Sequence, residues 1–222
     1  MKKESKIVTT NQNGLSTDLE KIIERYNLEN FKKPVSLESQ EIFNSILSWI
    51  NSFKEKKIIL DIGCGVGEST FKLAMQYADH LVIGIDKSIS RIDRKNKFKK
   101  ALPSNCLLVR GDAIDLWLLF HQHKSSLNIV KQYILYPNPW PLKHHVKKRW
   151  HGHPIIPFVL DLCENIELRS NWKIYLEEFN EVYDYFLKRR GELSLYEPLE
   201  FISPFEKKYC ESGHDIFRLV LE

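Results

Sequence analysis

A glycine-rich segment that begins with an acid, followed by two further acids, is the part of this 222-residue chain best suited to chemistry. The segment spans residues 61–67 and reads D-I-G-C-G-V-G, and Asp86 and Asp112 come later in the chain. Glycines allow a tight turn and let a ligand approach the backbone at a helix N-terminus. A carboxylate such as Asp86 can accept both ribose hydroxyls of a nucleoside, and Asp112 could take an adenine amino group. The pattern therefore predicts a nucleoside-containing cofactor.

Two cofactor classes fit this prediction, the nicotinamide dinucleotides and S-adenosylmethionine. Dinucleotide sites use G-x-G-x-x-G, because the third glycine lets helix and strand pack closely. Here that third position is Glu68, and the glycines stand at every second residue instead. An acid two residues before the first glycine also suits the cationic amino-acid end of S-adenosylmethionine better than a pyrophosphate. We predict S-adenosylmethionine, bound by Asp61, Gly63, Gly65, Gly67, Asp86, Lys87, Asp112 and Ala113.

Apolar runs and helical spacings predict alternating strands and helices around these residues. Strands are expected at 57–61, 81–86, 106–110, 131–136, 166–169, 193–196 and 216–221, and helices at 39–53, 68–77, 88–100, 155–163, 172–189 and 205–211. This order implies an α/β fold with a mostly parallel sheet and an antiparallel edge. We expect a single domain over residues 1–222. It would comprise an extension (1–53) with an amphipathic helix and a floppy first 13 residues, and a catalytic core (54–222).

The composition argues against several classes of protein. The chain has no run of about 18 apolar residues, so no membrane span is expected. Its polar, lysine-containing start is unlike a signal peptide. The four cysteines are scattered, and the histidines lack an acid or cysteine at ligand spacing, so no disulfide framework or metal site is expected. We expect a cytoplasmic monomer or homodimer that binds no membrane and no metal.

Basic residues cluster in two runs, 91–100 and 143–149, although the net charge of the chain is only +4. Clustered cations attract phosphate backbones. The second run follows a proline-rich loop at 136–142 (Y-P-N-P-W-P-L), where the strand at 131–136 ends. Prolines stiffen such a loop, and Trp140 offers a flat face on which a base could stack. The two runs favour a polyanionic partner over a merely solvated helix face.

At this point the sequence becomes similar to a known family. Residues 136–149 resemble the signature of bacterial tRNA (guanine-N7-)-methyltransferases, P-D-P-W-P-K-K-R-H followed by basic residues. Residues 170–175 (S-N-W-K-I-Y) resemble that family's T-D-x-x-x-Y, residues 203–208 (S-P-F-E-K-K) its T-x-F-E stretch, and residues 215–220 its closing strand. The likeness runs from about Lys57 to Glu222. It implies a Rossmann-like class I methyltransferase, with a seven-stranded sheet and helices on both faces, that methylates guanine N7 in tRNA.

The resemblance also implies roles on the substrate side. Asn138 would lie beside the transferred methyl group, as a catalytic residue that also contacts the cofactor. Lys147, Lys148 and Arg149 would contact RNA phosphates. Substrate contacts are implied for Trp140, Lys143, Asn171, Tyr175, Ser203 and Glu206.

The departures from the family pattern lie on this same side. Asn138 and Asn171 stand where the family has aspartates, Leu142 where it has a lysine, and Ser203 where it has a threonine. An amide can still accept through its oxygen and can donate to a carbonyl such as guanine O6. Two alternatives therefore stay open: a paralogue that methylates another substrate, and a non-catalytic cofactor- or RNA-binding subunit. Glu206 is either a reader of the guanine edge or a solvated helix charge.

Overall fold

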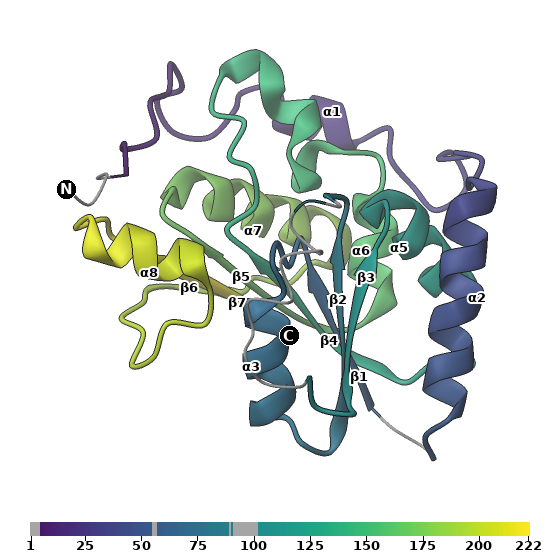
Figure 1. The fold of residues 1–222 in the computed structure, drawn as a ribbon. Coiled ribbons are helices and arrows are strands. Elements are labelled where there is room, and N and C mark those ends of the chain that lie inside the picture. The colour runs from purple at the N-terminus through teal and green to yellow at the C-terminus, as the bar shows by residue number, and fades with distance from the viewer. Residues whose placement is uncertain (1–4, 55–56, 89, 91–101) are drawn as a thin grey trace. The chain divides into compact units, whose positions relative to one another are not determined.

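The computed structural model describes residues 5–54, 57–88, 90 and 102–222 (Figure 1). The chain divides into two compact units. The cofactor-loop unit comprises residues 33–135 and 161–164, and the tail unit comprises residues up to 32, 136–160 and 165–222. The predicted extension is thus divided, because residues up to 32 group with the tail unit and residues 33–53 with the other. The helix predicted at 88–100 and the first basic run lie outside the described residues.

Four parallel strands form the centre of the cofactor-loop unit. They are β1 (Lys57–Ile62), β2 (His80–Asp86), β3 (Cys106–Arg110) and β4 (Ile129–Leu135), in the order β3-β2-β1-β4. β1 pairs in parallel with β2 and β4, and β2 with β3. The strands read as nearly continuous apolar runs because parallel strands are covered on both faces. Leu60, Leu81 and Ile83 are fully buried accordingly.

Among the described residues of this unit, three helices accompany these strands: α2 (Leu37–Asn51), α3 (Glu68–Gln76) and α5 (Ala113–Gln122). The Ser36 side chain caps α2 by accepting from the Ser39 backbone N–H. α2 packs on α5, where Phe43 meets Phe120 edge to face at 5.2 Å. The sequence analysis did not anticipate α5. Its residues 116–120 are all buried, so the segment lacks the polar face by which an amphipathic helix is detected.

The tail unit contains an antiparallel group of strands. β5 (Asn165–Ser170) and β6 (Glu192–Leu195) both pair antiparallel with β7 (Phe217–Leu221). Its α-helices are α1 (Leu19–Ile23), α7 (Lys173–Leu187) and α8 (Pro204–Glu211), and α6 (Ile156–Leu162) lies mostly within it. The second basic run, residues 143–149, is called the basic tail below. It contains the short 3₁₀ helix η2 (Lys143–Lys148), and a second one, η3 (Trp150–Gly152), follows it. α7 packs on β5 and β7, and α1 packs on α7.

Together the strands make a seven-stranded sheet, mostly parallel with an antiparallel edge, as predicted for an α/β fold. None of the helices within the described ranges is long and apolar enough to span a membrane.

The expectation of a floppy start is wrong for residues 5–13. Thr10 donates to the Pro141 carbonyl, and the Asn11 amide oxygen accepts from Lys143 N at 3.1 Å. Gln12 is 3% exposed and donates to the Glu178 carboxylate at 2.6 Å. Polarity was a poor guide here because these side chains are paired rather than solvated.

Candidate functional site

The acids of the predicted cofactor site lie near the carboxyl ends of three neighbouring parallel strands. Asp61 of β1 is in register with Gly84 of β2, and Asp86 of β2 with Arg110 of β3. Asp112 follows β3 after a single glycine. Ligands of open α/β sheets bind outside the carboxyl ends of such strands. The structure therefore brings these three acids to one edge of the cofactor-loop unit, whereas Asn138, also predicted to contact the cofactor, belongs to the tail unit.

The glycine loop has the backbone that its glycines were expected to allow. Gly63, Gly65 and Gly67 all have positive φ, and Gly67 is the N-cap of α3. A β-carbon on Gly67 would come within 2.5 Å of the Leu108 side chain, so the third glycine also permits close packing on β3. Asp86, which is 6% exposed, accepts from Gly65 N at 2.9 Å and from Ser88 N at 2.8 Å. This acid therefore fixes the conformation of the glycine loop.

Asp61 is fully buried and incompletely paired. Its Oδ2 accepts from Ser69 at 2.6 Å and from Thr70 at 2.7 Å, while its Oδ1 has no hydrogen-bond partner among the described residues. Burial raises the pKa of this carboxyl to about 6, against the lowering effect of the two hydroxyls. Most buried acceptors are paired. An open acceptor of this kind suits the ammonium group of an amino-acid ligand, which would also favour the ionised carboxylate.

Asp112 and Lys87, both assigned to the cofactor, form an ion pair of 3.0 Å. Asp112 Oδ1 caps α5 by accepting from Ile114 N at 2.9 Å. The pKa of Asp112 is lowered, because the hydrogen bond from Lys87 and those of the helix terminus outweigh desolvation. Lys87 and Asp112 line a cavity of about 270 Å³ together with Ser36, Glu38, Ser39, Ile42, Arg110, Gly111 and Asp115.

The proline-rich loop lies in the tail unit, and two of its residues are held in unusual backbone conformations. Tyr136 and Trp140 have φ of 52° and 44°. Such values strain a residue with a β-carbon and persist where the surroundings impose them. Tyr136 N donates to the Arg169 carbonyl at 2.8 Å, and its hydroxyl donates to Glu206 at 2.7 Å. The exposed Asn138 accepts weakly from Trp140 N at 3.4 Å.

Arg149 does not fit its predicted role as a phosphate contact. Its side chain is fully buried, and it donates to the carboxylate of Glu178, which is also buried. The guanidinium further donates to the Trp140 carbonyl at 3.0 and 3.1 Å and to Gln12 at 3.0 Å. Lys143, Lys147 and Lys148 are exposed and remain available to an anion. Lys148 places its ammonium 4.6 Å from the centre of the Trp140 ring.

Several predicted substrate residues are engaged in the tail unit's own structure. Tyr175 is buried and accepts from Trp150 N at 3.2 Å, and Ser203 caps α8 by accepting from Glu206 N. Glu206 is fully buried, so the expectation of a solvated helix charge is wrong. Its carboxylate accepts from Tyr136, Arg169 and Ile202 N. Asn171 donates to His214 at 2.9 Å.

Sequence reasoning missed the buried partners of these groups. Glu178 lies on the apolar face of α7 beside Tyr175, Phe179 and Val182, and a lone carboxylate at such a position signals a buried cation. The cation is Arg149, from the basic tail. Ser69 and Thr70, on the first turn of α3, could have been recognised as the hydroxyls facing Asp61. No group of three potential metal-binding side chains is found within the described part of the chain.

Comparisons with known proteins identify the family to which the chain belongs. A family model described as a putative methyltransferase matches residues 55–219. The tRNA (guanine-N(7)-)-methyltransferase of Thermotoga maritima is 28% identical over 183 residues, 78% of this chain and 56% of that protein. The protein of the same name from Staphylococcus epidermidis is 24% identical over 177 residues, 75% of this chain and 80% of that protein. The chain thus matches just over half of the first relative's length.

Among solved structures, an antibiotic-related methyltransferase superimposes with a TM-score of 0.56 at 20% identity, covering 85% of this chain and 96% of that one. This likeness concerns the fold. The region matched by the family model contains the glycine loop, the three strand-end acids and the proline-rich loop. The open Asp61 carboxylate fits the ammonium end of the methyl donor. The chain belongs to this methyltransferase family, and its cofactor is S-adenosylmethionine.

Proposed function

We propose that this enzyme transfers a methyl group to N7 of a guanine in tRNA. The proposal is carried by the combination of the proline-rich loop with the exposed lysines 143, 147 and 148. The chain is also similar to tRNA (guanine-N(7)-)-methyltransferases. Exposed cations that follow a possible base-stacking ring suit a nucleic acid, since phosphates supply the affinity and a stacked base the position. A tRNA substrate implies that the enzyme acts in the cytoplasm.

The proposed reaction asks little acid–base chemistry of the protein. Guanine N7 has a lone pair and no proton, so it attacks the methyl group directly, and the sulfonium donor leaves as a neutral thioether. Catalysis then consists mainly of positioning the base in line with the methyl group. Asp86 would hold the cofactor ribose, and Asp61 its ammonium group. Neither residue needs to move a proton during the transfer.

Asn138 would read the base in a way that a family aspartate cannot. Its oxygen faces Trp140 N, at 3.4 Å, which leaves the amide N–H₂ to point toward a ligand. An amide donor suits guanine O6, whereas a carboxylate suits the two donors on the Watson–Crick edge. We propose that Asn138 contacts O6 and that the half-buried Trp140 stacks on the base.

The test is methylation of tRNA that lacks N7-methylguanine, with labelled S-adenosylmethionine and analysis of the digested nucleosides. We expect labelled N7-methylguanosine, and less label from Asp86→Ala when the concentration of S-adenosylmethionine is below saturation. Label in a different nucleoside or in a small molecule would favour the divergent paralogue. RNA binding without any transfer would favour the non-catalytic subunit.

The variant Asn138→Asp refines this test. If guanine is read through O6, the change replaces a donor by a charge, and guanine methylation should fall about tenfold or more. If the base is read through its donors, methylation should hold or rise. Pro139→Ala, in the same loop at a residue without a base-reading group, should have a smaller effect.

A further inference from the structure

Residues 5–32, which precede the family match, have a fixed place in the tail unit. Glu178 Oε1 accepts from Gln12 Nε2 at 2.6 Å and from Ser16 N at 2.8 Å. Beyond this point α1 buries Leu19 and Ile23, and Tyr26 donates to the Gly152 carbonyl at 3.2 Å. The family model begins at residue 55, so it assigns no role to this segment. Because these contacts anchor the segment beside the basic tail, we infer its role from the residues that it exposes there.

The outer face of α1 is basic. Lys21 and Ile22 of α1 line the same cavity as Asp18, the N-cap, and Arg25, which lies two residues after the end of the helix. Leu19 and Ile23 are buried on the other side of α1. Lys21 and Arg25 are exposed. These residues line a cavity of about 320 Å³ with Tyr26 and with Lys147 from the basic tail. Three cations from two distant segments thus converge on one cavity, opposed by the single carboxylate of Asp18.

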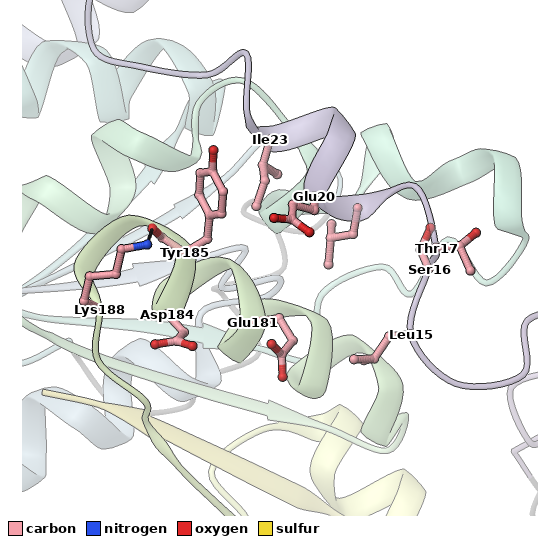
Figure 2. A pocket seen from close by; sticks show the side chains of 10 residues that line it. Leu15, Ser16, Thr17, Glu20, Ile23, Glu181, Asp184, Tyr185 and Lys188 are labelled. Carbon is pink, nitrogen blue, oxygen red and sulfur yellow. Dashed lines mark hydrogen bonds between the residues drawn. The ribbon is translucent and has the colours of Figure 1, made fainter.

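A second cavity, of about 370 Å³, gives the contrast (Figure 2). It is bordered by α1 and α7, and its ionisable groups are Glu20, Glu181, Asp184, Tyr185 and Lys188. Arg190 neutralises Glu181 and Asp184 in part, at 2.8 and 3.1 Å. Carboxylates predominate there, so a phosphate would be repelled. α1 therefore borders one cavity that attracts anions and one that does not.

We propose that the cavity formed by Lys21, Arg25 and Lys147 binds a backbone phosphate of the RNA substrate. This inference rests on the proposed function and extends it, because it makes the N-terminal segment part of the RNA-binding surface. A guanidinium and two ammonium groups supply both directional and point-charge contacts to phosphate oxygens. Ile22 and Tyr26 provide a wall without competing negative charge. The cavity would lengthen the surface begun by Lys143 and Lys148.

The experiment compares tRNA binding and methylation by the full chain and by the double variant Lys21→Ala/Arg25→Ala. Lys188→Ala is the matched control, because it removes a cation from the acidic cavity of the same unit. Each protein is titrated with tRNA at several salt concentrations, and its melting temperature is recorded. We expect the double variant to bind tRNA about three- to tenfold more weakly at low salt, with a salt slope smaller by about 0.7–0.9. Its KM for tRNA should rise while kcat at saturation holds, and the control should match the parent.

The outcomes separate this inference from the function on which it rests. If the parent methylates tRNA and the double variant binds equally well with an unchanged slope, the phosphate site is refuted and the function stands. If the parent binds RNA through these cations but methylates no guanine, the site stands and the guanine assignment fails. Absence of RNA binding at 50 mM salt refutes both. Tighter binding to anionic phospholipid vesicles than to tRNA would also overturn the RNA assignment.

Discussion

Asp61 in the cofactor-loop unit and Glu178 in the tail unit are both fully buried, but their surroundings shift their pKa values in opposite directions. In the cofactor-loop unit, Asp61 has two hydroxyl partners, one open oxygen and a pKa raised to about 6 by burial. In the tail unit, Glu178 has desolvation offset by His151 and Arg149, which lower its pKa to about 2. A buried acid without a cation is prepared for a ligand that brings one. A buried acid with its cation already in place holds the fold together.

Removing the cation of the tail unit should have the largest effect. Arg149→Ala leaves Glu178 buried without its guanidinium partner, and breaking a buried ion pair in this way costs about 3–5 kcal/mol. Urea unfolding should show this loss in the free energy of unfolding. The neighbouring change Lys148→Ala, at an exposed lysine, should cost less than about 1 kcal/mol. Equal losses for both would remove the distinction between the two residues.

Neutralising Asp61 in the cofactor-loop unit should instead raise the free energy of unfolding. Asp61→Asn keeps an acceptor for Ser69 and Thr70 but removes a buried charge. With a folded pKa of about 6 and an unfolded value near 3.8, the gain at pH 8 is roughly 3 kcal/mol. Cofactor affinity, measured by calorimetry, should nevertheless fall. A variant that is both less stable and unchanged in affinity would contradict the assignment of Asp61 to the ligand.

The pH dependence of stability should separate the two units. Because the folded pKa of Asp61 is raised, its stabilising contribution is present below pH 3.8 and lost as the pH rises to about 6. His151 is fully buried and its pKa is lowered by desolvation, so its contribution is lost as the pH falls below 6.5. Thermal unfolding of the cofactor-free protein should therefore show opposing slopes. Asp61→Asn should leave the His151 slope alone, and a profile that keeps both slopes would show that Asp61 is not their source.

A more moderate effect, on cofactor affinity, is expected at Asp86, the acid proposed to hold the cofactor ribose. Asp86→Ala removes the acceptor for Gly65 N and for the cofactor hydroxyls, so S-adenosylmethionine should bind about 1–3 kcal/mol more weakly. Calorimetry measures this directly, and Glu68→Gln on the same loop serves as the control. Unchanged affinity would rule out the ribose contact, and binding of NAD alone would restore the dinucleotide reading.

The smallest effect is expected at single lysines of the basic tail. Lys148→Ala should reduce the slope of log affinity for tRNA against log salt by about 0.7–0.9, because one phosphate contact is lost. Filter binding over a series of salt concentrations gives this slope. Lys207→Ala, at an exposed lysine of α8, is the control, and it should leave the salt dependence of tRNA binding unchanged. Salt-independent binding would favour a small uncharged substrate.

The cofactor half of the molecule could be predicted closely from the sequence. Strand ends and glycine positions depend on local rules, namely apolar runs and left-handed turns, so β1, β2 and the loop lie where expected. α5 escaped prediction because its central residues 116–120 are all apolar and buried, which hides the helical period. A helix without a polar face is therefore missed when helices are sought by their hydrophobic period.

The substrate half was harder because its polar residues serve tertiary contacts. Arg149 and its neighbour Lys148 look alike in a basic run, yet one is fully buried and the other exposed. Their difference depends on Glu178, 29 residues away, and on Gln12, 137 residues away. Motif membership alone therefore did not distinguish Glu206 and Tyr175, which hold the tail unit together, from residues that are open to a substrate.

The hydrogen bond from Gln12 to Glu178 has a consequence for how the chain folds during synthesis. These residues are 166 positions apart, so the first segment emerges from the ribosome long before its partner. At about 5–20 residues per second, the delay is on the order of ten to thirty seconds. Residues 33–135, whose strands pair with one another, are complete well within that interval. Residues 5–32 are therefore expected to be among the last parts of the chain to reach their folded positions.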